Sequence, residues 1–415
     1  MNRFLIAGVF FIALGACKPE AETANVLKTG IWRAVIEIQD QELPFNFEVT
    51  HDQQGGYDIY LINADEHLLL DEVSIREDSI DIALHIFDAD IKAQISGDSL
   101  NGRFIKNYEK DYSLPFEAVY GHEYRFEKED HSENAPDFSG KYDVTFLHET
   151  DTTKAIAIFR QVGDSVTGTF LTPTGDYRYL QGNVADDQLQ LSTFDGHHAY
   201  LFRASRLQDG TLQGEYYSGK TWKETWVAEK NENVSLPDAE SLTYLKEGYD
   251  RIAFNFPDVN GKPVSLQDEK YKNKVVILQL FGTWCANCMD ETKFLSPWYN
   301  ENKHRGVEII GLAYEHKDDF NYASQRVKKM IGKLGVRYDF LIAGTDDKEK
   351  AAQTLPMLNA VVAFPTTIFI GKDGKVKKIH TGFNGPGTGL YYDQFVQDFH
   401  STVNELLNEN LTAVR

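Results

Sequence analysis

Residues 275–288 read VVILQLFGTWCANC, an apolar run that ends in a Cys-x-x-Cys. The run predicts a buried strand, and the apolar residues of 289–302, spaced by three or four, indicate an amphipathic helix. Cys285 is therefore expected at a helix N-terminus, where free backbone amides and the helix dipole stabilise a thiolate. We predict that Cys285 is the nucleophile of a redox dithiol and that Cys288, one turn on, closes a disulfide with it.

The cysteine count favours redox chemistry over a structural role for this pair. The chain has three cysteines, and the third, Cys17, lies far from the other two. A disulfide within one Cys-x-x-Cys closes too small a loop to stabilise a fold. A zinc site needs four ligands, and His304 and His316 are not at the spacing of a zinc finger. We therefore predict no metal.

The N-terminus predicts export and lipidation. Arg3 precedes an uncharged apolar run over residues 4–15, and the Leu14-Gly15-Ala16-Cys17 that ends it resembles the bacterial lipoprotein signal. The run is shorter than the ~20 residues of a membrane-spanning helix, so that alternative is disfavoured. We expect residues 1–16 to be a signal peptide, Cys17 to carry lipid as the membrane attachment, and residues 17–27 to form a polar tether.

Length and charge limit the remaining function classes. A chain of 415 residues predicts about three domains. Its net charge of −21 argues against nucleic-acid binding and against electrostatic attachment to anionic lipid.

The region after the tether is predicted to be β-rich and duplicated. Residues 28–127 and 137–230 each contain strands of alternating apolar and polar residues. The stretch 29–32 recurs as 139–142, and 97–104 recurs as 209–216, in the same order. We predict two antiparallel β domains, each a sandwich or a barrel, with polar linkers at 128–136 and 229–237. The two β domains are expected to fold without the part of the chain that follows them, because the linkers isolate them and each has its own apolar face. His197 and His198 could suggest a metal site, but adjacent strand residues point to opposite faces of a sheet. We therefore predict that they are exposed residues of a hairpin.

From residue 243 the pattern changes to alternating strands and helices. Strands are predicted over 275–281 and 307–313 with a helix between them, which implies a parallel pair with a helical crossover. Helices over 318–334 and 348–355, strands over 364–370 and 376–380, and a last helix over 391–407 follow. Residues 243–412 are thus predicted to form an α/β domain.

Several motifs of this domain together resemble the TlpA-type thiol-disulfide oxidoreductases of bacterial envelopes, which have a thioredoxin fold. The matching motifs are Phe254-Asn255-Phe256-Pro257-Asp258 with Gly261-Lys262, Trp284-Cys285-Ala286-Asn287-Cys288, Glu291, Phe364-Pro365-Thr366 and Asp373-Gly374. They lie in about the last two fifths of the chain.

The resemblance carries several implications for the site. Pro365 is expected to be cis and opposite the dithiol, with Trp284, Phe364 and Thr366 helping to dock an extended substrate. The expected partners are a protein disulfide or thiol client and an envelope electron donor. No cofactor is implied beyond the redox-active disulfide. The expected location is the bacterial envelope, lipid-anchored in the outer membrane and facing the periplasm.

Three features depart from the family pattern. The residues between the cysteines are Ala286-Asn287 without a proline, Gln279 stands where thioredoxins carry a buried aspartate, and Thr292 replaces a frequent proline. Because Gln279 cannot take a proton, we predict that Glu291 is the catalytic base that helps deprotonate Cys288 and that burial raises its pKa. The alternative for Glu291 is a solvated carboxylate without contacts.

Two other function classes remain open from the sequence. A peroxiredoxin-like peroxidase is expected to carry a threonine three residues before its reactive cysteine, where this chain has Gly282, with Thr283 one position off. A binding or scaffold lipoprotein would use the β domains to recognise a partner and the dithiol only secondarily.

Overall fold

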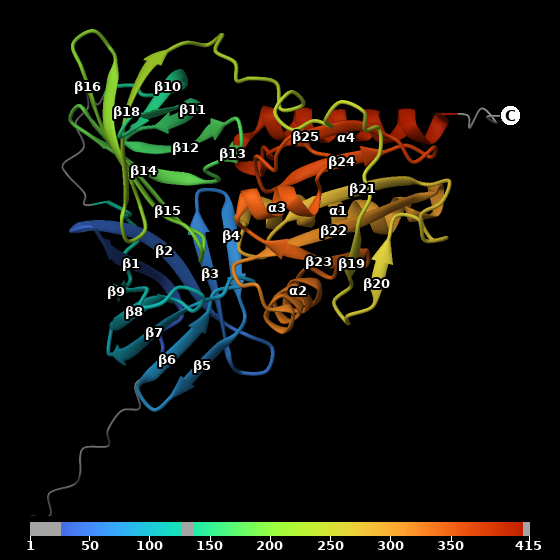
Figure 1. Cartoon of the computed structure of the whole chain (residues 1–415). Coiled ribbons are helices and arrows are strands. Elements are labelled where there is room, and N and C mark those ends of the chain that lie inside the picture. Colours follow the sequence, from blue (N-terminus) through green and yellow to red (C-terminus); the bar gives the residue numbers. More distant parts are fainter. Residues whose placement is uncertain (1–25, 127–135, 410–415) are drawn as a thin grey trace, which may run out of the picture.

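The computed structural model describes residues 26–126 and 136–409 (Figure 1). It consists of two antiparallel β domains followed by an α/β domain, which lies beside both of them in Figure 1. The expected β-rich region and α/β domain are thus confirmed. The predicted signal peptide, Cys17, most of the tether and most of the first linker lie outside the described residues.

β domain 1 is a barrel-like meander. Within residues 26–126, nine strands form one sheet in the order β4-β3-β2-β1-β9-β8-β7-β6-β5. Their inward faces are apolar, as the alternating sequence predicts. The strands are β1 (Gly30–Ile38), β2 (Gln41–His51), β3 (Tyr57–Asn63), β4 (Glu66–Leu70), β5 (Val73–Arg76), β6 (Ser79–Ala83), β7 (Ala89–Ser96), β8 (Ser99–Lys106) and β9 (Ser113–Tyr120).

β domain 2 closes on itself. Within residues 136–230 the order is β11-β10-β18-β17-β16-β15-β14-β12-β13, and β11 also pairs with β12, which closes a barrel to which β13 is attached. Buried aromatic rings such as Phe146, Phe170 and Trp226 fill its interior, so it is a packed core. The strands are β10 (Gly140–His148), β11 (Asp151–Val162), β12 (Ser165–Thr172), β13 (Gly175–Asp176), β14 (Leu180–Ala185), β15 (Gln188–Phe194), β16 (Ala199–Arg206), β17 (Leu212–Ser218) and β18 (Trp222–Lys230).

The two β domains share a pattern that is consistent with the duplication seen in the sequence. In each, the first strand pairs with the last, β1 with β9 and β10 with β18. The repeated stretches 97–104 and 209–216 lie in matching hairpins, β7–β8 and β16–β17, next to that last strand.

The α/β domain has a mixed central sheet in the order β23-β22-β21-β24-β25. β21 runs parallel to β22 and antiparallel to β24, and every residue of β21 is buried. Its elements are β19 (Asn255–Pro257), β20 (Pro263–Ser265), β21 (Val275–Phe281), α1 (Ala286–Asn302), η1 (Lys303–Arg305), β22 (Val307–Glu315), α2 (Phe320–Leu334), β23 (Asp339–Thr345), α3 (Lys348–Thr354), β24 (Thr366–Ile370), β25 (Val376–Thr381), η2 (Pro386–Thr388) and α4 (Leu390–Asn408). Sequence patterns predicted the helices and four sheet strands but not β23.

The three domains pack on one another, contrary to the isolation that the polar linkers suggested. One cluster of buried apolar residues includes β domain 1, part of β domain 2 and the α/β domain. Helix α2 contacts β domain 1 directly: the Tyr322 hydroxyl donates to Asp88 at 2.8 Å, and Lys333 forms an ion pair with Glu72 at 2.7 Å. Among the described residues, none of the helices combines the length and the apolar character that a membrane crossing requires.

Candidate functional site

The two cysteines form a disulfide at the start of α1, directly after β21. Cys285 retains 5% of its surface exposed, whereas Cys288 is fully buried. Cys285 is the N-cap of α1, and the Cys288 amide donates to Cys285 Sγ at 3.1 Å. A helix N-terminus thus points at the more accessible sulfur, an arrangement that stabilises a thiolate.

Glu291 is fully buried on α1, three residues after Cys288, so the solvated alternative is wrong. Gln279 Nε2 donates to Glu291 Oε2 at 2.8 Å, and the Thr367 hydroxyl donates to the other carboxyl oxygen. Burial raises the pKa of Glu291 to about 7, although these two hydrogen bonds act to lower it. The carboxyl group therefore changes its charge close to neutral pH.

Gln279 and Thr292, two of the residues that depart from the family pattern, are hydrogen-bond partners in this structure. Gln279 Nε2 lies 3.2 Å from Thr292 Oγ1, and the Thr292 hydroxyl lies 3.3 Å from Gln279 Oε1. Gln279 Nε2 also lies 3.5 Å from the Cys288 carbonyl oxygen. Gln279 and Thr292 therefore hold the first turns of α1 against β21.

The predicted docking residues surround Cys285. The Phe364–Pro365 peptide bond is cis, and the Phe364 carbonyl oxygen lies 3.5 Å from Cys285 Sγ. The Trp284 indole donates to the Tyr314 carbonyl at 2.9 Å and meets Phe364 edge to face, with ring centroids 5.8 Å apart. The Thr366 hydroxyl donates to the Ala363 carbonyl at 2.8 Å, which fixes the turn before β24.

A second buried carboxyl group, Glu315, lies next to the redox loop. It accepts hydrogen bonds from the Thr283 amide at 2.9 Å and the Thr283 hydroxyl at 2.8 Å. Burial raises the pKa of Glu315 to about 7 against these hydrogen bonds. The hydroxyl of Thr283, the residue closest to a peroxiredoxin-like threonine, is thus bonded to Glu315.

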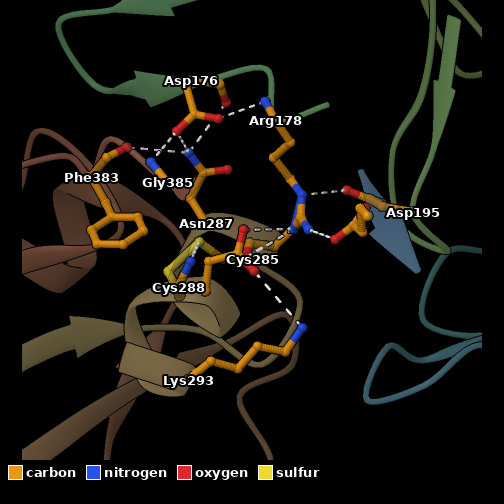
Figure 2. Close-up of polar contacts among 12 residues, drawn as sticks. Asp176, Arg178, Asp195, Cys285, Asn287, Cys288, Lys293, Phe383 and Gly385 are labelled. Carbon is orange, nitrogen blue, oxygen red and sulfur yellow. Dashed lines mark hydrogen bonds and ion pairs between the residues drawn. A yellow bond between two sulfur atoms is a disulfide. The ribbon is translucent and has the colours of Figure 1, made fainter. Parts of the chain in front are cut away.

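Arg178 of β domain 2 joins all three domains at the dithiol (Figure 2). Its guanidinium is paired with Glu66 of β domain 1, lies 3.5 Å from Asp195 of its own domain, and lies 3.1 Å from Asp290 of α1. Its Nη1 also donates to the Ala286 carbonyl, between the two cysteines, at 3.3 Å. The Arg178 side chain is 2% exposed, so these partners replace water around its charge.

Asp176 makes a second contact between β domain 2 and the redox loop. Asn287 Nδ2 donates to the Asp176 carbonyl at 3.2 Å, and the Gly385 amide donates to the Asp176 carboxylate at 2.7 Å (Figure 2). Both residues between the cysteines, Ala286 and Asn287, therefore contact β domain 2.

Comparison with known proteins decides the family. Residues 248–379 match the AhpC/TSA family. Thiol-disulfide oxidoreductase ResA of Bacillus subtilis (strain 168) is 31% identical over 138 residues, which cover 33% of this chain and 69% of that protein. The chain belongs to the thiol-disulfide oxidoreductases. ResA of Bacillus thuringiensis (strain Al Hakam) is 33% identical over 139 residues, 34% of this chain and 70% of that protein. A solved thiol:disulfide interchange protein from Chlorobium tepidum TLS aligns with 39% of this chain and 99% of its own, at 21% identity and a TM-score of 0.31.

In this thiol-disulfide oxidoreductase, the structure brings six of the predicted residues together: Trp284, Cys285, Cys288, Phe364, Pro365 and Thr366. Glu291 lies behind them on α1. Cys17, the predicted lipidation site, lies outside the described residues. Within the described ranges, no group of three or more histidine, cysteine, aspartate or glutamate side chains is arranged to hold a metal.

The prediction that His197 and His198 are exposed hairpin residues is wrong for His197, which is 8% exposed. Its ring lies 6.2 Å from that of Trp284 and 5.6 Å from that of Phe87. The turn that carries His197 is covered by the other two domains. The exposure of His197 therefore depends on how the domains pack, which local sequence does not encode. His198 is partly exposed, and its Nδ1 lies 2.9 Å from Asp195.

Sequence patterns did not single out Arg178, Asp176 or Glu315 as part of the site. Arg178 and Asp176 lie more than a hundred positions before the cysteines, and nothing in their local sequence marks them. Glu315 is the last residue of β22, and a charged residue at the end of the largely apolar stretch 309–314 was the one available signal for it.

Proposed function

We propose that this oxidoreductase reduces protein disulfides through the Cys285/Cys288 dithiol. The observation that carries the proposal is the unequal exposure of two sulfurs at one helix N-terminus. Cys285 is reachable and accepts a hydrogen bond from the Cys288 amide, and Cys288 is buried behind it. This is the arrangement expected of an attacking thiolate and a resolving thiol.

The proposed reaction has two steps. The Cys285 thiolate attacks one sulfur of the client disulfide, which forms a mixed disulfide and releases the first client thiolate. Cys288 then loses its proton to Glu291 and attacks Cys285 Sγ, which releases the second client thiolate and forms the Cys285–Cys288 disulfide. The client gains two electrons, and an envelope electron donor returns two electrons to the dithiol.

Insulin reduction tests this function against the peroxidase alternative. We expect the full chain to accelerate reduction of insulin by dithiothreitol at least about tenfold over the uncatalysed reaction, because a helix N-terminus increases the fraction of Cys285 that is present as the attacking thiolate near neutral pH. Consumption of hydroperoxide should not exceed that of a Cys285→Ser variant. Hydroperoxide turnover without insulin reduction would instead support the peroxidase.

Replacing Glu291 with Gln is expected to slow reduction of insulin about tenfold near pH 7 and to remove the dependence on a group of pKa about 7. Gln keeps the shape and can still accept from Gln279, but it cannot take the Cys288 proton. The measurement is the rate of turnover from pH 5 to 9. Glu301→Gln, on the exposed face of the same helix, is the matched control.

Stability gives an independent check of the Glu291 assignment. The pKa of Glu291 in the folded state, about 7, lies above its ordinary value of 4.5, so the folded state holds this proton more tightly. The resulting stabilisation is complete below about pH 4.5 and is lost as the pH rises through about 7, a change of about 3 kcal/mol. Glu291→Gln should lack this part of the pH dependence. Unchanged rates and an unchanged stability profile would contradict the assignment.

We also propose that lipid on Cys17 anchors the chain in the bacterial envelope, at the outer membrane and facing the periplasm. The support is the lipoprotein-like sequence that ends at Cys17. Replacing Cys17 with Ser should release the protein from membranes in fractionation and leave insulin reduction intact. Continued fractionation with membranes would contradict lipidation as the attachment.

A further inference from the structure

The dithiol opens into a cleft that β domain 2 shares with the α/β domain. The cleft has a volume of about 270 Å³. Thr174, Tyr177 and Tyr200 of β domain 2 line it together with Trp284, Cys285 and Phe364. Because Cys285 is 5% exposed, a client sulfur has to come through this opening to reach it.

We propose that β domain 2 forms one wall of the client-binding site and that this wall selects an extended cysteine-bearing segment with neutral or basic neighbours. The inference rests on the proposed reductase function, since it concerns how a client reaches Cys285.

The wall is fixed in place by a turn of β domain 2 over residues 174–178, here called the β13 turn. A Cβ added to Gly175 would lie 2.9 Å from Asn287 Nδ2, and one added to Gly382 would lie 2.8 Å from the Thr174 carbonyl carbon. The backbones at Gly382 and Thr174 therefore approach more closely than a side chain at position 382 would allow, and Gly175 leaves room for the Asn287 side chain. Arg178 has a φ of 56°, a left-handed conformation that is unfavourable for a residue with a side chain. Its buried ion pairs hold it there.

The size of the cleft favours an extended segment. Ligand pockets for small molecules commonly have volumes of about 300–1,000 Å³, so this cleft takes only the cysteine and its nearest neighbours. An extended chain rises about 3.3 Å per residue, and such a chain can enter and leave across the cleft. A disulfide recessed in a folded surface cannot reach Cys285 through it.

Charge favours neutral or basic segments. Around the Arg178 and Asp176 contacts, the described residues include four carboxyl groups (Glu66, Asp176, Asp195 and Asp290), two cations (Arg178 and Lys293) and His198, whose Nδ1 lies 2.9 Å from Asp195. The carboxyl groups are thus in excess behind the wall, and the whole chain has a net charge of −21. An acidic segment is repelled from such a site, and a basic one is attracted.

Thr174 is the position at which the wall can be tested. It lines the cleft, and it is exposed, so a longer charged side chain can be accommodated there. Ser165 is the matched control, because it is also exposed and lies at the opposite end of β12. Thr174→Lys and Ser165→Lys change the net charge equally, so only a local effect separates them.

The experiment uses two heptapeptides whose central cysteine carries a thiopyridyl group, one flanked by Lys and one by Glu. Attack by the reduced enzyme releases thiopyridone, whose absorbance gives kcat/KM. All proteins are full chains with Cys17→Ser, so that only the dithiol reacts. We expect the Lys peptide to react about tenfold faster than the Glu peptide at low salt, with the ratio falling as salt is added.

The variants should move this ratio in opposite directions. Thr174→Lys should lower the Lys-to-Glu ratio about fivefold and Thr174→Glu should raise it by a similar factor, whereas Ser165→Lys should leave it nearly unchanged. A purely structural disturbance would change the Lys-to-Glu ratio in the same direction in both Thr174 variants. The proposal is overturned if the Thr174 variants match Ser165→Lys, or if a protein with a recessed disulfide reacts as fast as the peptides. If the small neutral disulfide 2,2′-dithiodipyridine is not reduced either, the reductase function itself fails.

Discussion

Replacing Arg178 with Met is expected to lower the free energy of unfolding by about 3–5 kcal/mol. Met keeps the length of the side chain but removes the charge that Glu66, Asp195 and Asp290 share. Glu66 would be left buried without this cation, and Asp195 and Asp290 would keep only His198 and Lys293, of which Lys293 lies 3.9 Å away. A buried charge that loses its partner costs more than the ion pair itself contributes. The measurement is urea unfolding of the oxidised full chain at neutral pH.

Arg160→Met is the control for this substitution, because Arg160 is exposed on the same domain. It should change the stability by no more than about 0.5 kcal/mol. A loss below about 1 kcal/mol in Arg178→Met would mean that solvent reaches the Arg178 partners and that the junction of the three domains is not buried in solution.

Local sequence predicts the parts of this molecule that are determined by interactions between residues close together in the chain. The apolar run 275–281 requires burial, the spacing in 289–302 requires a helix, and the two cysteines follow at the junction. The dithiol, the helix N-terminus and the α/β order were therefore predictable. The raised pKa of Glu291 was also predictable, because a carboxyl group one turn beyond Cys288 on the same face shares its burial.

The junction with the β domains was not predictable, because it depends on how domains far apart in sequence pack. Arg178 looks like an ordinary charged residue of a hairpin, and only the structure places Glu66 and Asp290 around it. His197 was wrongly predicted to be exposed for the same reason. The strand β23 has an Asp at its start and a Gly near its end, so its pattern is weaker than those of β21 and β22.

The structure also explains a departure from the family pattern. Asn287, which stands where a proline is frequent, donates from its side chain to Asp176 of β domain 2. A proline at this position would lack that donor. The dipeptide between the cysteines is thus matched to the domain that covers it.

Replacing Cys285 with Ser is expected to reduce insulin turnover at least about 10³-fold, the largest effect of any single change considered for activity. A hydroxyl group at this position is not ionised near neutral pH and does not exchange with disulfides. Cys288→Ser should also stop turnover, but for a different reason: the first attack proceeds and the mixed disulfide accumulates because nothing resolves it. The difference between the two variants separates the attacking sulfur from the resolving one.

Trapping the mixed disulfide tests the assignment of these roles most directly. The full chain with Cys288→Ser is incubated with an excess of the Lys-flanked thiopyridyl peptide, digested without reduction, and mapped by mass spectrometry. We expect a peptide adduct on Cys285 in this variant, and little adduct on Cys288 in the Cys285→Ser variant, because Cys288 is buried. An adduct that forms on Cys288 as readily as on Cys285, or no adduct on Cys285 in a folded Cys288→Ser protein, would contradict the assignment.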